Sequence, residues 1–260
     1  WTEEEFRDAA VKMTDESKGQ YGIMFGSGVV DWGRAIFGNG ETQIYDWDAK
    51  KMQATDNDAL YHIWDLWIDD LMLNEKAAPA VLNSKDIGGG FETGKYGMAL
   101  IGFWDIAEIH KVVQDSFEWD LIPLPTNETY GQWRTQMFAN ALSISANSEK
   151  KDAAFEYIKW TLENRDIQTN SVSLPVNKEI SGDVEFLNEF ADGAKHFNKQ
   201  LALDALANSV TWRNTGTVAE INNNVIKPEI ERLILKPDST DLKTVLENIQ
   251  TEGQKIFDAE

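Results

Sequence analysis

The sequence contains no cysteine, and this absence excludes disulfides, thiolate metal ligands and a cysteine nucleophile together. Basic residues are also scarce, because 24 Lys and Arg stand against 44 Asp and Glu and leave a formal net charge of −20. A surface this acidic repels phosphate backbones and anionic lipid headgroups, so nucleic acid is not an expected partner. No apolar run approaches the length of a membrane span.

The signatures of nucleotide and metal sites are incomplete. Gly89 and Gly94 have the spacing of a phosphate-binding P-loop, but Tyr96 stands where that motif needs Ser or Thr. Three histidines fall on separate predicted helices without the spacing of metal ligands: His62, His110 and His196. The sequence therefore predicts no metal and no other cofactor.

One stretch, Gly88–Lys111, predicts a loop, a strand and a helix in succession. Its glycines permit positive φ, and Met98–Ile101 is an apolar run short enough for a buried strand. The corner Gly102–Asp105 follows, and its last residue is placed to cap a helix predicted over Ile106–Val113. Open α/β sheets bind ligands at the carboxyl ends of their strands, so Trp104 in this corner is a candidate for ligand contact.

The same pattern stands earlier in the chain. A strand is predicted over Tyr21–Phe25, and a glycine turn and then Asp31-Trp32 follow it. The most regular helical spacing covers Asp58–Leu73, where Trp64 and Trp67 are predicted to lie in the core. The chain has ten tryptophans, so either a Trp-rich core or a binding surface for flat apolar faces is expected.

The remaining chain alternates strands and helices and then becomes helical. Strands are predicted over Glu118–Ile122 and Phe138–Ser145, with a polar loop over Thr126–Thr135 between them. Helical spacing then covers these segments: Asp152–Leu162, Arg165–Ser171, Val184–Phe190, Ala194–Asn208, Thr217–Leu235 and Thr240–Asp258. This order indicates an α/β fold with a mostly helical C-terminal third.

Five segments, in order, resemble the extracellular solute-binding proteins of ABC sugar importers, the family of the maltose-binding-protein type. The segment with GKYGMALIGFWDIAEI resembles the family's signature, in which a Gly-Lys pair, an apolar strand and a Gly-x-Trp corner lead into a helix. The segments are Trp1–Phe6, Phe91–His110, Trp119–Pro125, Ala141–Trp160 and Leu174–Ile180.

The resemblance implies a periplasmic-binding-protein-like lobe of type II, with a mixed sheet flanked by helices, over residues 1–180. Residues 181–260 would form a helical tail that returns to the N-terminal lobe. In that family most of an N-terminal lobe precedes the Trp-Thr-x-x-Glu-Phe helix, whereas here this motif begins at Trp1. We therefore expect the chain to hold essentially the second lobe and the C-terminal helices.

The resemblance also implies a ligand cleft lined by aromatic and polar side chains. Trp104 matches the position that commonly stacks on a sugar ring. For the others, packing in the core or between lobes is an equally good interpretation. The candidate ligand-binding residues are Trp104, Trp32, Asp31, Trp133, Arg134, Trp212 and Asn214.

The implied function is that of a substrate-binding component of an ABC importer. It would bind a sugar or oligosaccharide as a monomer, present it to the membrane permease, and act outside the cell, as an anchored lipoprotein or in the periplasm. Two alternatives stay open. One is a glycoside hydrolase whose acidic pair is not identifiable among 44 acidic residues. The other is a non-catalytic surface module whose tryptophans are core.

Overall fold

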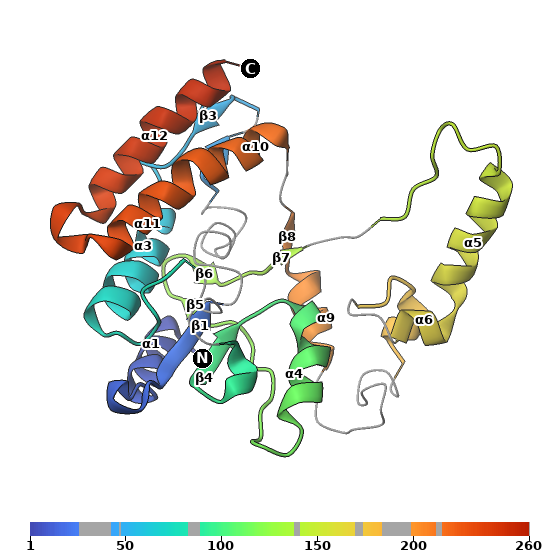
Figure 1. Cartoon of the computed structure of the whole chain (residues 1–260), viewed down its shortest axis with the longest axis horizontal. Coiled ribbons are helices and arrows are strands. Elements are labelled where there is room, and N and C mark those ends of the chain that lie inside the picture. Colours follow the sequence, from blue (N-terminus) through green and yellow to red (C-terminus); the bar gives the residue numbers. More distant parts are fainter. Residues whose placement is uncertain are drawn as a thin grey trace. The chain divides into compact units, whose positions relative to one another are not determined.

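The computed structural model describes residues 1–25, 43–46, 48–82, 89–137, 141–169, 174–183, 199–211 and 215–259 (Figure 1). The chain divides into two compact units. Unit 1 comprises Trp1–Ile101, Leu124–Gln136 and Ser209–Glu260, and unit 2 comprises Gly102–Pro123 and Met137–Asn208. This division does not follow the expected boundary at residue 180, and the assignment of residues 1–180 and 181–260 to lobes stays a prediction.

Helix α1 (Glu3–Lys12) opens unit 1 with a capping box. Thr2 Oγ1 accepts a hydrogen bond from the Glu5 amide at 3.1 Å, and the Glu5 carboxylate accepts one from the Thr2 amide at 2.8 Å. Phe6 and Ala10, four residues apart on one face, are buried. The helix start that the sequence predicts is therefore confirmed.

A two-stranded parallel sheet lies beside α1. Strand β1 (Tyr21–Phe25) pairs with β4 (Tyr96–Leu100), and Tyr21 stands opposite Tyr96. Both predicted strands are confirmed, although β4 begins two residues before its expected start and is only partly buried beyond Tyr96. A Cβ atom on Gly22 would lie 1.7 Å from the carbonyl oxygen of Ala10, so glycine is required where α1 crosses β1.

The predicted helix over Asp58–Leu73 is confirmed in extent but changes type midway. Helix α3 (Asp58–Trp64) continues directly into η2 (Asp65–Asn74), a π-helix with i→i+5 hydrogen bonds. The predicted core positions Trp64 and Trp67 are fully buried. Phe25 stacks on Trp67 at 4.6 Å between ring centroids, which joins the sheet to this helix.

A short hairpin packs on the C-terminal helix. Strands β2 (Tyr45–Asp46) and β3 (Lys51–Met52) are antiparallel. Gln254 Oε1 accepts from the Met52 amide at 3.0 Å, and Gln250 Oε1 accepts from the Ala54 amide at 2.8 Å. The side chains of one helix thus accept hydrogen bonds from backbone amides at the outer edge of this hairpin.

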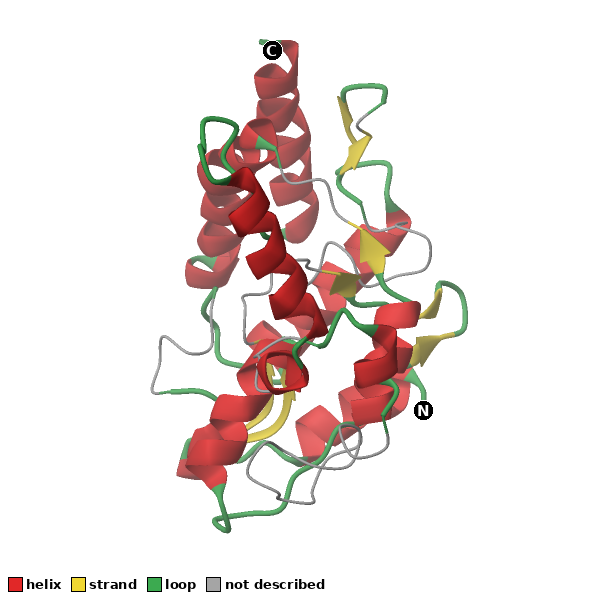
Figure 2. Ribbon diagram, turned by 90° about the vertical axis from the view of Figure 1, so that its right-hand side faces the viewer, coloured by secondary structure: helices red, strands yellow, loops and turns green. Residues whose placement is uncertain are grey.

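The C-terminal helices complete the core of unit 1, and the predicted helical segments there are confirmed. Pro228, which lacks an amide donor, lies in the first turn of α11, directly after the π-helix η6. The inner face of α12, which ends at the C label in Figure 2, buries six residues from Leu242 to Phe257. The elements are α10 (Gly216–Ile221), η6 (Asn222–Ile226), α11 (Lys227–Leu235) and α12 (Leu242–Asp258).

The loop predicted over Thr126–Thr135 is instead a tight hairpin of β5 (Thr126–Asn127) and β6 (Gly131–Gln132). Asn127 Oδ1 accepts the amides of Thr129 and Tyr130 at 2.8 and 2.9 Å, and Gly131 supplies a φ of 78°. Asn and Gly serve these roles in turns because Asn bonds its own backbone and Gly tolerates positive φ.

One predicted strand is wrong, and another is absent over the part of it that the structure describes. Glu118–Ile122 is not a strand, because the Leu121 amide bonds to its neighbour Asp120 and the following prolines supply no donors. Phe138–Ser145 is described only from residue 141, and residues 141–145 form no strand. Strand pairing there is confined to β7 (Gln136–Met137) and β8 (Val210–Thr211), where the chain leaves unit 1 and returns to it.

Unit 2 is helical in its described part. The predicted helix starts at Ile106, Asp152 and Arg165 hold to within one residue, whereas Val184–Phe190 and residues 194–198 lie outside the described residues. Its helices are η5 (Phe103–Asp105), α4 (Ile106–Val113), α5 (Lys151–Glu163), α6 (Arg165–Thr169), α7 (Lys178–Ser181) and α9 (Lys199–Ala207). The other 3₁₀ helices among the described residues are η1 (Glu16–Lys18), η4 (Phe91–Thr93) and η7 (Pro237–Ser239). Across the described residues of both units, every helix is too short or too polar to span a bilayer.

We predict that Gly22→Ala lowers the free energy of unfolding of unit 1 by about 3 kcal/mol, because the new methyl group meets backbone and not a movable side chain. The measurement is urea unfolding followed by Trp fluorescence. Gly216→Ala is the control, since a Cβ there meets nothing within 4 Å. Equal midpoints for the two variants would contradict the close crossing of α1 and β1.

Candidate functional site

The two strand ends of the parallel sheet lie at one edge of unit 1. Phe25 and Leu100 are paired at the ends of β1 and β4, so the chain leaves the sheet twice at the same edge (Figure 1). The segment after β1 carries Asp31 and Trp32, which lie outside the described residues. The segment after β4 leads into Gly102 and unit 2.

Trp104 occupies the corner after β4, at the start of unit 2. Its side chain is 40% exposed. A Cβ atom on Gly102 would come within 2.2 Å of the indole carbons Cε2 and Cζ2, so the ring lies against the glycine backbone. The Gly-x-Trp spacing therefore has a local cause, since a side chain at residue 102 would displace the indole.

Asp105 is the residue before α4, as predicted, but its side chain makes no capping hydrogen bond. Its backbone is already helical, with φ −79° and ψ −18°, whereas a capping residue normally has extended backbone. The 3₁₀ turn Phe103–Asp105 runs directly into α4 and explains the difference. The position of the helix start is confirmed, and the capping bond is not.

Trp133 lies in the core of unit 1. It is 1% exposed, and its ring packs against Phe6 and Trp67 at centroid distances of 5.1 and 5.7 Å. Its neighbour Arg134 is half-buried. Ligand contact by either residue stays a prediction, and the packing of Trp133 favours the core role that the sequence left open. Trp212 and Asn214 lie outside the described residues.

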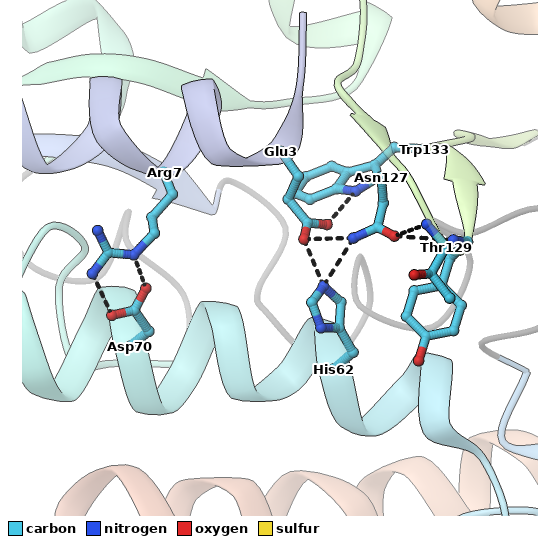
Figure 3. A network of polar contacts seen from close by, with 8 residues as sticks. Glu3, Arg7, His62, Asp70, Asn127, Thr129 and Trp133 are labelled. Atoms are coloured by element: carbon cyan, nitrogen blue, oxygen red, sulfur yellow. Dashed lines mark hydrogen bonds and ion pairs between the residues drawn. The ribbon is translucent and has the colours of Figure 1, made fainter.

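The structure reveals a polar network in unit 1 that sequence reasoning missed (Figure 3). Oε1 of the Glu3 carboxylate lies 2.5 Å from Nε2 of His62. Oε2 of the same carboxylate accepts a hydrogen bond from the indole N–H of Trp133 at 2.9 Å. Asn127 Nδ2 also donates to Oε1 at 2.8 Å. One carboxylate thus joins α1, α3 and the β5–β6 hairpin. No sequence signal marks it, because these partners are 59 to 130 residues away.

The electrostatics of this network favour a charged pair. Burial alone would raise the pKa of Glu3, but hydrogen bonds from His62, Trp133 and Asn127 and the charge of His62 lower it below its usual range. The hydrogen bond to Glu3 raises the pKa of His62, against the opposing effect of burial. The Glu3 side chain is 11% exposed and that of His62 is 37% exposed, so solvent screens only one partner well.

A second ion pair lies on the same side of α1, one turn after Glu3 (Figure 3). Arg7 Nε donates to Asp70 at 2.6 Å, and its NH2 group donates to Asp70 at 2.9 Å and to Glu75 at 2.7 Å. This fork geometry is the one that Arg forms best with carboxylates. The hydrogen bonds to Asp70 raise the pKa of Arg7, so the guanidinium stays charged throughout the accessible pH range. Helix α1 is therefore fixed on η2 as well as on α3.

Two hollows of unit 1 are lined by residues other than the described candidates Trp104, Trp133 and Arg134. One of about 500 Å³ lies between α10–α11 and α12 and is lined by Glu220, Glu229 and Lys255 among others. Another, of about 610 Å³, lies at the end of α1 and is lined by residues such as Lys12 and Glu75. In the described part of the chain, His, Asp and Glu side chains form no group of three that is placed to hold a metal ion.

Comparison with known proteins establishes the family. Residues 1–166 match the family described as bacterial extracellular solute-binding protein, which is more than half of the 260 residues. The chain belongs to this family. No curated protein matches it in sequence.

Solved structures share the fold. An ABC substrate-binding protein from Listeria monocytogenes in complex with cycloalternan is 21% identical, with a TM-score of 0.75, over 98% of this chain and 63% of its own. The maltose/maltodextrin-binding domain MalE from Bdellovibrio bacteriovorus, bound to maltotriose, is 15% identical, with a TM-score of 0.71, over 98% and 66%. UgpB from Mycobacterium tuberculosis, in complex with glycerophosphocholine, is 17% identical, with a TM-score of 0.68, over 99% and 64%.

These likenesses confirm the predicted fold class, an α/β fold of the type II periplasmic-binding-protein kind. They also show a difference in length. The chain spans 63 to 66% of the length of these three structures, although nearly all of it takes part in each match.

We predict that the stability of unit 1 falls as the pH rises above 6.5. A histidine whose pKa is raised on folding contributes stability that is complete below its unfolded value of 6.5 and is lost as the pH passes its folded value. His62→Gln should remove this fall and cost on the order of 1 kcal/mol at pH 6, a value reduced by solvent screening. The measurement is urea unfolding at pH 6 to 9.

The other groups of this region act at lower pH. Glu3 contributes stability above its unfolded pKa of 4.5 and loses it as the pH falls through its lowered folded value. Burial, and after it the negative charges of Asp65 and Asp241, raises the pKa of Asp69 to about 6, so its destabilising ionisation is essentially complete by pH 7.

His110→Gln, on α4 of unit 2, is the control for His62→Gln. A His62→Gln protein that keeps the wild-type slope above pH 7 would refute the role of this pair.

Proposed function

We propose that the protein is the substrate-binding component of an ABC importer and that its ligand is a sugar or an oligosaccharide. The family match over residues 1–166 carries this proposal, because the members of the family bind solutes outside the cell. The bound cycloalternan and maltotriose of the two structural relatives support a carbohydrate. The net charge of −20 disfavours the binding of an anionic ligand, whereas it does not repel an uncharged sugar.

Trp104 is the residue that we propose for ring stacking. The apolar C–H face of a sugar covers an indole, and polar side chains at the rim receive its hydroxyl groups. Asp31, Trp32, Trp212 and Asn214 remain candidates for those further contacts, as do Trp133 and Arg134. Ligand would act by shifting the protein toward the conformation that the permease binds, and no bond would be made or broken.

The cellular setting is part of the same proposal. The family description, bacterial extracellular solute-binding protein, supports a location outside the cytoplasmic membrane. We propose that it is held there as a lipoprotein or is free in the periplasm, and that it meets the permease as a monomer. The glycoside hydrolase alternative receives no support from the family or from the relatives, which are carriers of solutes.

The test is calorimetric titration of the protein with maltotriose, cycloalternan, tagatose and glycerophosphocholine, the ligands of relatives in the same fold. We expect saturable binding of at least one sugar, and Trp104→Ala should weaken it about tenfold or more with unchanged circular dichroism. Trp1→Ala is the matched control, because Trp1 is also 40% exposed, and it should bind as the wild type does.

Three outcomes would overturn parts of this proposal. Saturable binding of glycerophosphocholine alone would replace the sugar with a phosphodiester. Hydrolysis of maltotriose that is lost on one Asp or Glu substitution would establish the enzyme alternative. Equal affinities for Trp104→Ala and Trp1→Ala would remove Trp104 from the site and leave the family assignment standing.

A further inference from the structure

One segment of unit 1, Leu124–Gln136, stands in the chain between two stretches of unit 2. The chain passes between the units at four places, which follow Ile101, Pro123, Gln136 and Asn208. The segment begins at one of these places and ends at another, and we call it the connecting segment. Its position on unit 1 therefore fixes where two of the four connections leave that unit.

The connecting segment also carries candidate ligand residues. Trp133 and Arg134 belong to it. The carbonyl of the next residue, Thr135, accepts the Val210 amide at 2.9 Å, and the chain reaches the candidate Trp212 two residues after Val210. A change in how this segment lies on unit 1 would therefore move several proposed ligand contacts together.

The backbone attaches the connecting segment to the start of α1. The Thr126 amide donates to the Trp1 carbonyl at 3.0 Å, and an isolated parallel bridge pairs Thr126 with Thr2. The Trp133 amide donates to the Pro125 carbonyl at 3.0 Å, which closes the segment on itself. A two-stranded hairpin is at best marginally stable alone in water. Side-chain contacts with unit 1 must therefore supply the rest of its stability.

Two of these contacts end on the Glu3 carboxylate (Figure 3). Asn127, at the end of β5, donates to Oε1 at 2.8 Å, and Trp133, directly after β6, donates to Oε2 at 2.9 Å. One charged acceptor thus holds both strands of the hairpin, and hydrogen bonds to an ionised acceptor are stronger than neutral ones. The amide nitrogen of Asn127 is aimed at Glu3 because its oxygen already accepts the amides of Thr129 and Tyr130.

We propose that Glu3 is a positioning residue for ligand binding. Through Asn127 and Trp133 it holds the connecting segment on unit 1 in the arrangement that binds ligand. It touches no ligand itself, because both carboxylate oxygens are bonded and the residue is 9% exposed. This inference rests on the proposed function. The apparent affinity falls with the fraction of molecules in the competent arrangement, so release of the segment weakens binding without removing a ligand contact.

The groups that face this carboxylate give the hold a pH dependence. The hydrogen bond to Glu3, and then the negative charges of Glu3 and Asp65, raise the pKa of His62 against the effect of burial. The ring of Tyr130 lies on the other side, with its centroid 5.4 Å from that of His62. A protonated His62 favours the charged form of Glu3, so the hold is strongest below the folded pKa of His62 and weakens above it.

The test is calorimetric titration of Asn127→Asp with maltotriose, cycloalternan and tagatose at pH 5 and pH 8. The variant keeps the oxygen that accepts the Thr129 and Tyr130 amides, but it places a second carboxylate against Glu3. At pH 8 both carboxylates are charged and repel, so we expect the dissociation constant to exceed that of the wild type about fivefold or more. At pH 5 the two carboxylates share a proton, which restores a hydrogen bond between them, and the ratio to the wild type should return toward one.

Asn177→Asp is the matched control. The oxygen of Asn177 likewise accepts a backbone amide, that of Glu179 at 3.0 Å, but in unit 2. This variant should follow the wild type at both pH values. An equal loss of affinity by Asn127→Asp at pH 5 and pH 8 would indicate ordinary structural damage and overturn the role of Glu3. Unchanged affinity at both pH values would overturn that role and leave the proposed function standing. A wild-type protein that binds none of the three sugars would overturn the proposed sugar ligand instead.

Hydrogen exchange in the ligand-free protein tests the hold separately from binding. The Thr126 and Trp133 amides report on the connecting segment, and the amides of α12 report on the rest of unit 1. At pH 8 we expect Asn127→Asp to speed exchange of the first group about tenfold or more over the wild type and to leave α12 unchanged. Equal acceleration in α12 would mean that the whole unit opens. That result, or no acceleration in the segment, would refute a local hold by Glu3, whatever the ligand.

Discussion

The carboxylate of Glu3 is the interaction on which the rest of unit 1 depends. It is a charge near the N-terminus of a helix, where the helix dipole favours an anion, and the residue is only 9% exposed. A buried charge is tolerated only with partners, and this one has them on α3 and on the β5–β6 hairpin. Since no single element supplies all of the partners, this carboxylate links the stability of α1, α3 and the hairpin. The parallel sheet is coupled to these elements as well, because α1 crosses β1 at Gly22 without room for a side chain.

Local chemistry explains most of what the sequence predicts correctly. The capping box of α1, the apolar spacing of Asp58–Leu73 and the inner face of α12 depend on residues within a few positions of one another, so they are visible in the chain itself. The burial of Trp64 and Trp67 follows from the same spacing. The Gly-x-Trp corner is also local, because the indole of Trp104 rests on the glycine two residues before it.

Long-range pairing explains what the sequence could not predict. A strand exists only if a partner strand lies beside it, and the apolar run before Pro123 has none in the described chain. The Glu3–His62 pair joins residues 59 apart and gives no periodic signal. Of the candidate site, the position and exposure of Trp104 could be predicted, whereas the burial of Trp133 depends on Phe6, Trp67 and Glu3, which approach it only in the folded unit.

The glutamines of α12 have a consequence for the tendency of the chain to aggregate. An open strand edge invites pairing with another chain, which is the first step of amyloid-like association. Gln250 and Gln254 occupy the outward amides and carbonyls of the hairpin from Lys50 to Ala54, so an incoming strand finds these groups already bonded. The helix therefore acts as a shield against aggregation. It protects a chain that has no cysteine from which to form a disulfide.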